Sequence, residues 1–205
     1  MVAKRQPQSI DTKILSRIYG KGRGYVFTSA DFVDLASQDT VHQALSRHAR
    51  AGTIRKLARG LYDYPRQSPK LGPVPPYDED IAKALNDRHS TRIQASGAHA
   101  ANMLGLSTQV PVRTVFLTDG VSRKVQIGRR QIALKRTSLR QMATAGRVSG
   151  TVIQALRWLG ASNIDDKIVA TLRRKLGPDD KKQLIADLRY APAWVAQVMR
   201  KVAAP

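Results

Sequence analysis

The first third of the chain carries helical and strand-like patterns of apolar residues in a defined order. Ile10, Ile14 and Ile18 recur at helical spacing. Ser37 occupies an N-cap position for a later helix, and Gly52 occupies the position of a C-terminal glycine. The predicted elements are helices at 10–18, about 29–35 and about 38–51, and strands at 25–27, 53–57 and 61–64. This order is that of a winged helix-turn-helix whose wing is the closing hairpin.

A proline-rich stretch follows and divides the predicted domains. Residues 65–76 contain five of the ten prolines in the chain. Proline lacks a backbone donor and restricts φ, so we expect an extended, semi-rigid linker here. The predicted layout is a winged helix-turn-helix domain at 1–65, a linker at 66–76 and a C-terminal domain at 77–205.

The rest of the chain changes from mixed patterns to purely helical ones. A helix is expected at 78–86 and a second short one at 98–104, among strand-like runs at 92–96, 112–118, 124–127 and 131–137. Helices are expected at 149–159, 164–176, 179–188 and 193–202. The fold class is therefore α+β: a winged helix-turn-helix followed by a larger α/β domain, with a small sheet at about 92–137 and a helical end at 147–203.

The charge balance favours a polyanionic partner. Lys and Arg number 35 against 15 Asp and Glu, which gives a formal net charge of +20. Such a chain attracts nucleic acid through long-range steering and counterion release. The alternative is that the whole proteome is basic, so that the positive charge reflects no nucleic-acid partner. A GC-rich genome would also favour Arg over Lys among the basic residues. Both halves of the chain are basic, so charge alone does not choose the half that binds DNA.

The predicted helix at 38–51 has one apolar face and one polar face. Val41, Ala44 and Leu45 form the apolar face. A helix that reads the major groove needs a packed side and a side rich in donors, with Gln suited to adenine and Arg to guanine. The same pattern also describes an ordinary solvated helix. The predicted DNA-binding residues are Thr40, Gln43, Ser46, Arg47 and Arg50 on the helix and Arg55, Lys56 and Arg59 on the wing.

Two segments resemble a known family. Residues 41–62 read VHQALSRHARAGTIRKLARGLY, which is similar to the recognition helix and wing of AbiE-type antitoxins. Residues 94–106, QASGAHAANMLGL, resemble the start of the C-terminal domain of that family. The similarity is specific over 38–64 and 92–118.

The resemblance implies a repressor of its own promoter that is also the antitoxin of a toxin–antitoxin operon. It implies two partners, operator DNA and a nucleotidyltransferase-like toxin, and a two-fold operator would allow cooperative pairing on DNA. The alternative is a stand-alone winged-helix regulator, or a basic nucleic-acid-binding protein with no toxin partner. The neighbouring gene would separate these two.

Enzymatic and metal chemistry have little support in the sequence. The chain has no Cys, and His42, His48, His89 and His99 show no metal-binding spacing. The acidic clusters at 78–80, 165–166 and 179–180 stand at predicted helix starts, where acids favour the helix dipole. We therefore expect no catalytic residue, no metal and no cofactor. The N-terminus has no signal-peptide pattern and no stretch has the apolar length of a membrane span, so a cytoplasmic location is expected.

Overall fold

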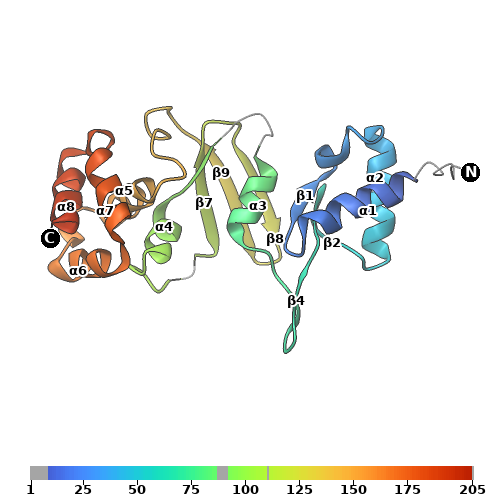
Figure 1. The fold of residues 1–205 in the computed structure, drawn as a ribbon, viewed down its shortest axis with the longest axis horizontal. Coiled ribbons are helices and arrows are strands. Elements are labelled where there is room, and N and C mark those ends of the chain that lie inside the picture. Colours follow the sequence, from blue (N-terminus) through green and yellow to red (C-terminus); the bar gives the residue numbers. More distant parts are fainter. Residues whose placement is uncertain (1–8, 87–91, 110, 205) are drawn as a thin grey trace, which may run out of the picture. The chain divides into compact units, whose positions relative to one another are not determined.

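The computed structural model describes residues 9–86, 92–109 and 111–204 and shows a mixed α+β protein (Figure 1). The chain divides into two compact units, Met1–Leu85 (unit 1) and Asn86–Pro205 (unit 2). No helix in the described part is long and apolar enough to cross a membrane.

Unit 1 builds a three-stranded antiparallel sheet and a separate two-stranded ribbon among its helices. Its sheet has the order β1-β3-β2, so β3 pairs on both sides. The serines at 9 and 37 cap α1 and α2 by accepting hydrogen bonds from backbone N–H groups, as N-cap residues do. The elements are α1 (Ile10–Lys21), β1 (Val26–Thr28), the 3-10 helix η1 (Ser29–Phe32), α2 (Gln38–Arg50), β2 (Arg55–Ala58), β3 (Leu61–Asp63), β4 (Arg66–Ser68), β5 (Gly72–Val74) and α3 (Asp78–Leu85).

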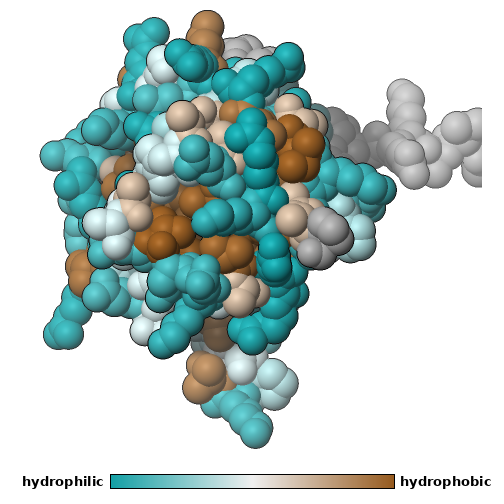
Figure 2. All heavy atoms as spheres, turned by 90° about the vertical axis from the view of Figure 1, so that its left-hand side faces the viewer, coloured by the Kyte–Doolittle hydropathy of each residue, from teal (hydrophilic) through white to brown (hydrophobic). Residues whose placement is uncertain are grey.

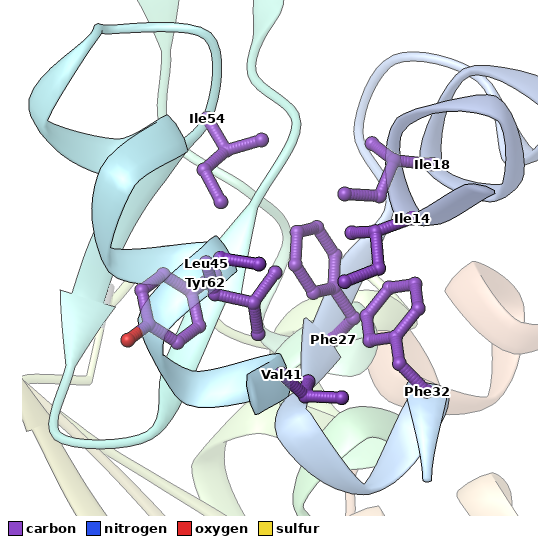
Figure 3. Packing of buried hydrophobic residues seen from close by; sticks show 9 residues of the cluster. Ile14, Ile18, Phe27, Phe32, Val41, Leu45, Ile54 and Tyr62 are labelled. Atoms are coloured by element: carbon purple, nitrogen blue, oxygen red, sulfur yellow. The ribbon is translucent and has the colours of Figure 1, made fainter. Parts of the chain in front are cut away.

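One apolar core joins α1, the sheet and α2. Figure 3 shows Ile14 and Ile18 of α1 facing Phe27 and Phe32, while Leu45 of α2 closes the cluster from the other side. All five side chains are fully buried. Burial of one such side chain stabilises a fold by about 1.5–3 kcal/mol, so the core holds α2 firmly by one face.

The predicted helix at 29–35 is shorter than expected. The structure places only the 3-10 helix η1 there, and the Asp31 carboxylate accepts from the Thr28 N–H at 2.7 Å at its start. Beyond it, Asp34 accepts two hydrogen bonds from the guanidinium of Arg17 on α1, each at 2.7 Å. These hydrogen bonds outweigh burial and raise the pKa of Arg17 above its usual value. The hydrogen bonds between Arg17 and Asp34 thus join α1 to the segment that leads into α2.

The proline-rich segment is a hairpin rather than a linker. Strands β4 and β5 pair antiparallel and form a narrow ribbon (Figure 1). Only Pro73 lies inside a strand, which a two-stranded ribbon tolerates because each strand has a free edge. After the hairpin, α3 packs against β1 and buries Ile81 and Ala82. The boundary of unit 1 therefore lies at residue 85, beyond the linker that we predicted at 66–76.

Unit 2 begins with a four-stranded sheet of order β6-β7-β9-β8. Strands β7 and β9 are parallel, and the other two pairs are antiparallel. Strand β9 thus inserts between two strands that precede it in the chain. The elements are β6 (Ile93–Ala95), α4 (Gly97–Met103), β7 (Arg113–Thr118), β8 (Arg123–Ile127), β9 (Arg130–Arg136), α5 (Val148–Leu159), the 3-10 helix η2 (Ala161–Asn163), α6 (Asp166–Lys175), α7 (Pro178–Ala186), the 3-10 helix η3 (Leu188–Tyr190) and α8 (Ala193–Ala203).

The helices at the end of the chain are joined by a buried carboxylate. Asp187 is buried and accepts hydrogen bonds from Ser149, Arg147 and Gln183, so it links the start of α5 to the end of α7. Figure 2 shows apolar side chains gathered within the otherwise hydrophilic surface of this end. A small hollow of about 240 Å³ lies between α6 and α8.

Candidate nucleic-acid interface

Helix α2 presents a polar face directly opposite its buried one. Val41, Ala44 and Leu45 are completely buried in the core of unit 1. The five helix positions that the sequence predicted for DNA contact are all exposed: Thr40, Gln43, Ser46, Arg47 and Arg50. The helix therefore has the two-sided character that a groove-reading helix requires.

Two of these five positions take part in holding the fold: Arg47 pairs with α1, and Thr40 bonds to the cap of its own helix. The guanidinium of Arg47 lies 2.9 Å from both carboxylate oxygens of Asp11 on α1, and its side chain remains 51% exposed. The Nε2 atom of His48 lies 3.4 Å from the same carboxylate. Thr40 shares a hydrogen bond with the hydroxyl of Ser37 at the helix start. The other three, Gln43, Ser46 and Arg50, are exposed and make no such contact with the residues that the structure describes.

The sequence reasoning missed an acidic residue on the same face. Asp39 is exposed in the first turn of α2. It lies four residues before Gln43 and seven before Ser46, and this spacing places all three on one side of the helix. Extending the helical spacing one turn back from Gln43 would have found it. A carboxylate here would accept a hydrogen bond from the N4 amine of cytosine.

The hairpin formed by β2 and β3 carries the predicted wing cations. Gly60 has φ of +72° and allows the tight turn after Arg59, where a side chain would be strained. The pairing of β2 with β3 is irregular between Lys56 and Ala58. Lys56 and Arg59 are both exposed. Together with Arg50, they form no ion pair among the residues that the structure describes, so we name these three side chains the basic triad.

The third wing cation, Arg55, has a structural partner. It stands opposite Asp63 in the register of β2 with β3, and Asp63 is only 1% exposed. Its Nε and Nη2 atoms donate to the two oxygens of that carboxylate at 3.0 and 2.6 Å. Nη2 also donates to the backbone oxygen of Val74, which ties β5 to the wing hairpin. The structure thus uses Arg55 to compensate a buried charge.

Two further arginines of unit 1 lie over aromatic rings, one after β3 and one before α3. The guanidinium of Arg23 lies 4.7 Å above the ring of Tyr64 and donates to the oxygen of Pro65. The guanidinium of Arg66 lies 3.7 Å above the ring of Tyr77. At the tip of the β4–β5 ribbon, Lys70 is exposed. The sequence pattern did not predict this ribbon, because the prolines in the segment indicated an extended linker.

Other candidate chemistry is sparse in the described part of the chain. No three His, Asp or Glu side chains there are arranged to hold a metal ion. His42 and His48 lie on different sides of α2, and His99 packs edge-on against Phe116. His89 lies outside the described residues. The acidic clusters start α3, α6 and α7 as predicted, and Asp165 caps α6 by accepting from the Ile168 N–H.

Comparison with known families gives one match. Residues 13–184 match the family described as a family of unknown function, DUF6088. The match extends from α1 into α7 and so includes α2, the β2–β3 hairpin and the sheet of unit 2. No curated protein matches the chain.

Proposed function

We propose that this chain, which belongs to the DUF6088 family of unknown function, binds double-stranded DNA through a winged helix-turn-helix in unit 1. One observation carries the proposal. The core holds α2 by one face, the opposite face is polar and exposed, and the cationic turn of the β2–β3 hairpin belongs to the same small unit. The element order α1, β1, η1, α2, β2, β3 supports it, because a wing hairpin follows the second helix of such a motif directly.

In this proposal α2 enters the major groove. The groove is about 12 Å wide, and a helix with its side chains measures about 10–12 Å across. Gln43 and Arg50 supply donors for adenine and guanine, while Asp39 supplies an acceptor for cytosine. Lys56 and Arg59 hold phosphates beside the helix, and Arg47 reaches the backbone from the α1 side. Arg55 is left out because it neutralises buried Asp63.

The biological role that we propose is autoregulation by an antitoxin in the cytoplasm. It rests on the resemblance to AbiE-type antitoxins in residues 41–62 and 94–106, and the latter segment forms β6 and α4. In that role unit 1 represses the promoter and unit 2 counters a nucleotidyltransferase-like toxin. A nucleotidyltransferase gene beside the coding region supports this role. A neighbourhood without one favours a stand-alone regulator.

The direct test is a footprint on the DNA upstream of the coding region, measured at 50 and 200 mM salt. We expect a discrete protected site whose affinity falls on the order of a hundredfold or more between the two salts, because several phosphate contacts release counterions. Uniform protection along the DNA, or an affinity independent of salt, contradicts the proposal.

The Asp11–Arg47 pair predicts an unusual gain of affinity. The Asp11 carboxylate pairs with the Arg47 guanidinium, which in this proposal contacts a DNA phosphate. The carboxylate also places a negative charge beside the proposed interface. We expect Asp11→Asn to raise the affinity for duplex DNA by a few-fold, as measured by fluorescence anisotropy at low salt. It should also lower the stability of unit 1 by about 1 kcal/mol or less, because an exposed ion pair and a first-turn acid are lost.

The matched control removes an exposed acid from unit 2. Asp179→Asn changes the net charge by the same amount, and Asp179 is paired with Lys182 on the surface. We expect this variant to bind DNA with nearly unchanged affinity. If Asp11→Asn leaves the affinity unchanged or lowers it, Arg47 does not contact the phosphates.

A further inference from the structure

Unit 2 contains a large groove on one face of its sheet. The groove has a volume of about 840 Å³. Its floor is formed where three strands lie side by side: Val115 of β7 pairs with Ala133 of β9, which in turn pairs with Lys124 of β8. Side chains alternate between the two faces of a strand, so Leu117 and Lys135 lie on this face in the next row of the sheet. The floor is therefore apolar along β7 and at Ala133, and basic at Lys124 and at Lys135.

The rim of the groove is strongly positive. Arg113, Lys124 and Lys135 are exposed, Arg123 completes the set, and none of the described residues that line the groove is acidic. None of the first three forms an ion pair among the residues that the structure describes. A concave site lined by charges of one sign concentrates its field and attracts ligands of the opposite sign. The ligand that complements this rim is an anion.

A tryptophan stands at the edge of the same groove. Trp158 lies in the last turn of α5 and remains 43% exposed, although burying its large apolar indole would be favourable. Its Cδ1 atom lies 3.5 Å from the position that a Cβ atom at Gly97 would occupy, and Gly97 has φ of +59°. The indole therefore lies close to the start of α4 and lines the same groove as the cations. Exposed aromatic rings next to cations form the stacking platforms of single-strand nucleic-acid sites.

We propose that this groove binds a nucleotide unit, a planar base joined to phosphate, supplied as a free nucleotide or within single-stranded nucleic acid. The base stacks on Trp158 over the apolar floor, and the phosphate contacts Lys124 and Lys135. The volume lies within the range of about 300–1,000 Å³ that is usual for small-molecule sites. An acidic peptide would satisfy the cations but has no group that requires the exposed indole. The proposal stands apart from duplex binding by unit 1.

The fluorescence of Trp158 tests the proposal without interference from unit 1. The two tryptophans of the chain, at 158 and 194, both lie in unit 2. In the full-length Trp194→Phe variant, Trp158 is the only tryptophan. We expect ATP, oligo-dT or both to quench it saturably, and tripolyphosphate to compete without quenching. Quenching by ATP alone assigns the site to free nucleotides, and stronger binding of oligo-dT assigns it to single strands.

Charge variants locate the site. We expect Lys124→Ala/Lys135→Ala to weaken binding by about tenfold or more, because two phosphate contacts are lost. Arg174→Ala/Lys175→Ala, which removes two exposed cations of α6, should bind like the parent. Equilibrium dialysis of labelled ATP and oligo-dT against chains that retain Trp194 repeats the comparison without the Trp194 substitution. The proposal is overturned if neither ATP nor oligo-dT binds, or if both charge variants lose the same amount of affinity for them. It is also overturned if poly-glutamate quenches Trp158 as strongly as the nucleotides do.

Discussion

Replacing the basic triad, Arg50, Lys56 and Arg59, with alanine is expected to weaken binding to duplex DNA by about a hundredfold or more. The three side chains are exposed and unpaired among the described residues, so each is available for a phosphate or a base edge. A lost contact of this kind costs about 1 kcal/mol or more, and 1.4 kcal/mol corresponds to a factor of ten. The logarithmic salt slope should fall by about two, because Lys56 and Arg59 are the two members assigned to phosphates. Fluorescence anisotropy at several salt concentrations measures both quantities.

The triad variant should fold normally, because none of its three side chains supports the core. Its thermal unfolding by circular dichroism is expected to match that of the parent chain. The matched control replaces Arg174, Lys175 and Lys201, three exposed cations of unit 2. An equal loss of affinity in this control would show that overall charge attracts the DNA, and it would remove α2 and the wing from their proposed role.

Replacing Arg55 with methionine is expected to destabilise unit 1 by about 3–5 kcal/mol. The carboxylate of Asp63 is 1% exposed and would lose both hydrogen bonds from its only cationic partner among the described residues. The backbone oxygen of Val74 would lose its donor as well. Hydrogen exchange of the β3 amides in increasing urea measures the loss. Tryptophan fluorescence comes from unit 2 alone and should report an unchanged transition.

A double variant tests whether the lost stability comes from the unpaired charge of buried Asp63 or from a changed geometry of the hairpin. Arg55→Met/Asp63→Leu removes both charges, and we expect it to recover most of the lost stability, because an apolar pair needs no compensation. If Arg55→Met alone is as stable as the parent, water reaches Asp63 and the pair contributes little. Loss of DNA binding in an Arg55 variant would follow from unfolding, so Arg55 is a poor probe of the interface.

Part of the candidate site follows from spacing along the chain. Val41, Ala44 and Leu45 repeat every three or four residues, so their burial predicts that Gln43, Ser46 and Arg50 face outward. The starts of the helices also follow from nearby residues, since a serine such as Ser37 accepts a hydrogen bond from an N–H only three residues away. Both inferences needed no knowledge of the tertiary structure.

The partners of the remaining cations depend on distant residues. Arg47 meets Asp11 across 36 positions of sequence, and Arg55 meets Asp63 only because β2 and β3 adopt one register. Neither contact leaves a periodic signal, so the sequence predicted all the cations of α2 and the wing as one interface. The structure divides them into side chains that hold unit 1 together and side chains that are available to a partner.

The sequence by itself determined most of the helices and strands, the α+β class and the two-faced character of α2, because backbone preferences and burial patterns act over a few residues. Tertiary structure alone decided that 66–74 returns as a hairpin, that β9 enters between β7 and β8, and that Trp158 lines the same groove as Lys124 and Lys135. These features arise from strand pairing and packing between segments far apart in the chain. Many pairings are compatible with the same local pattern, and only the complete fold selects one.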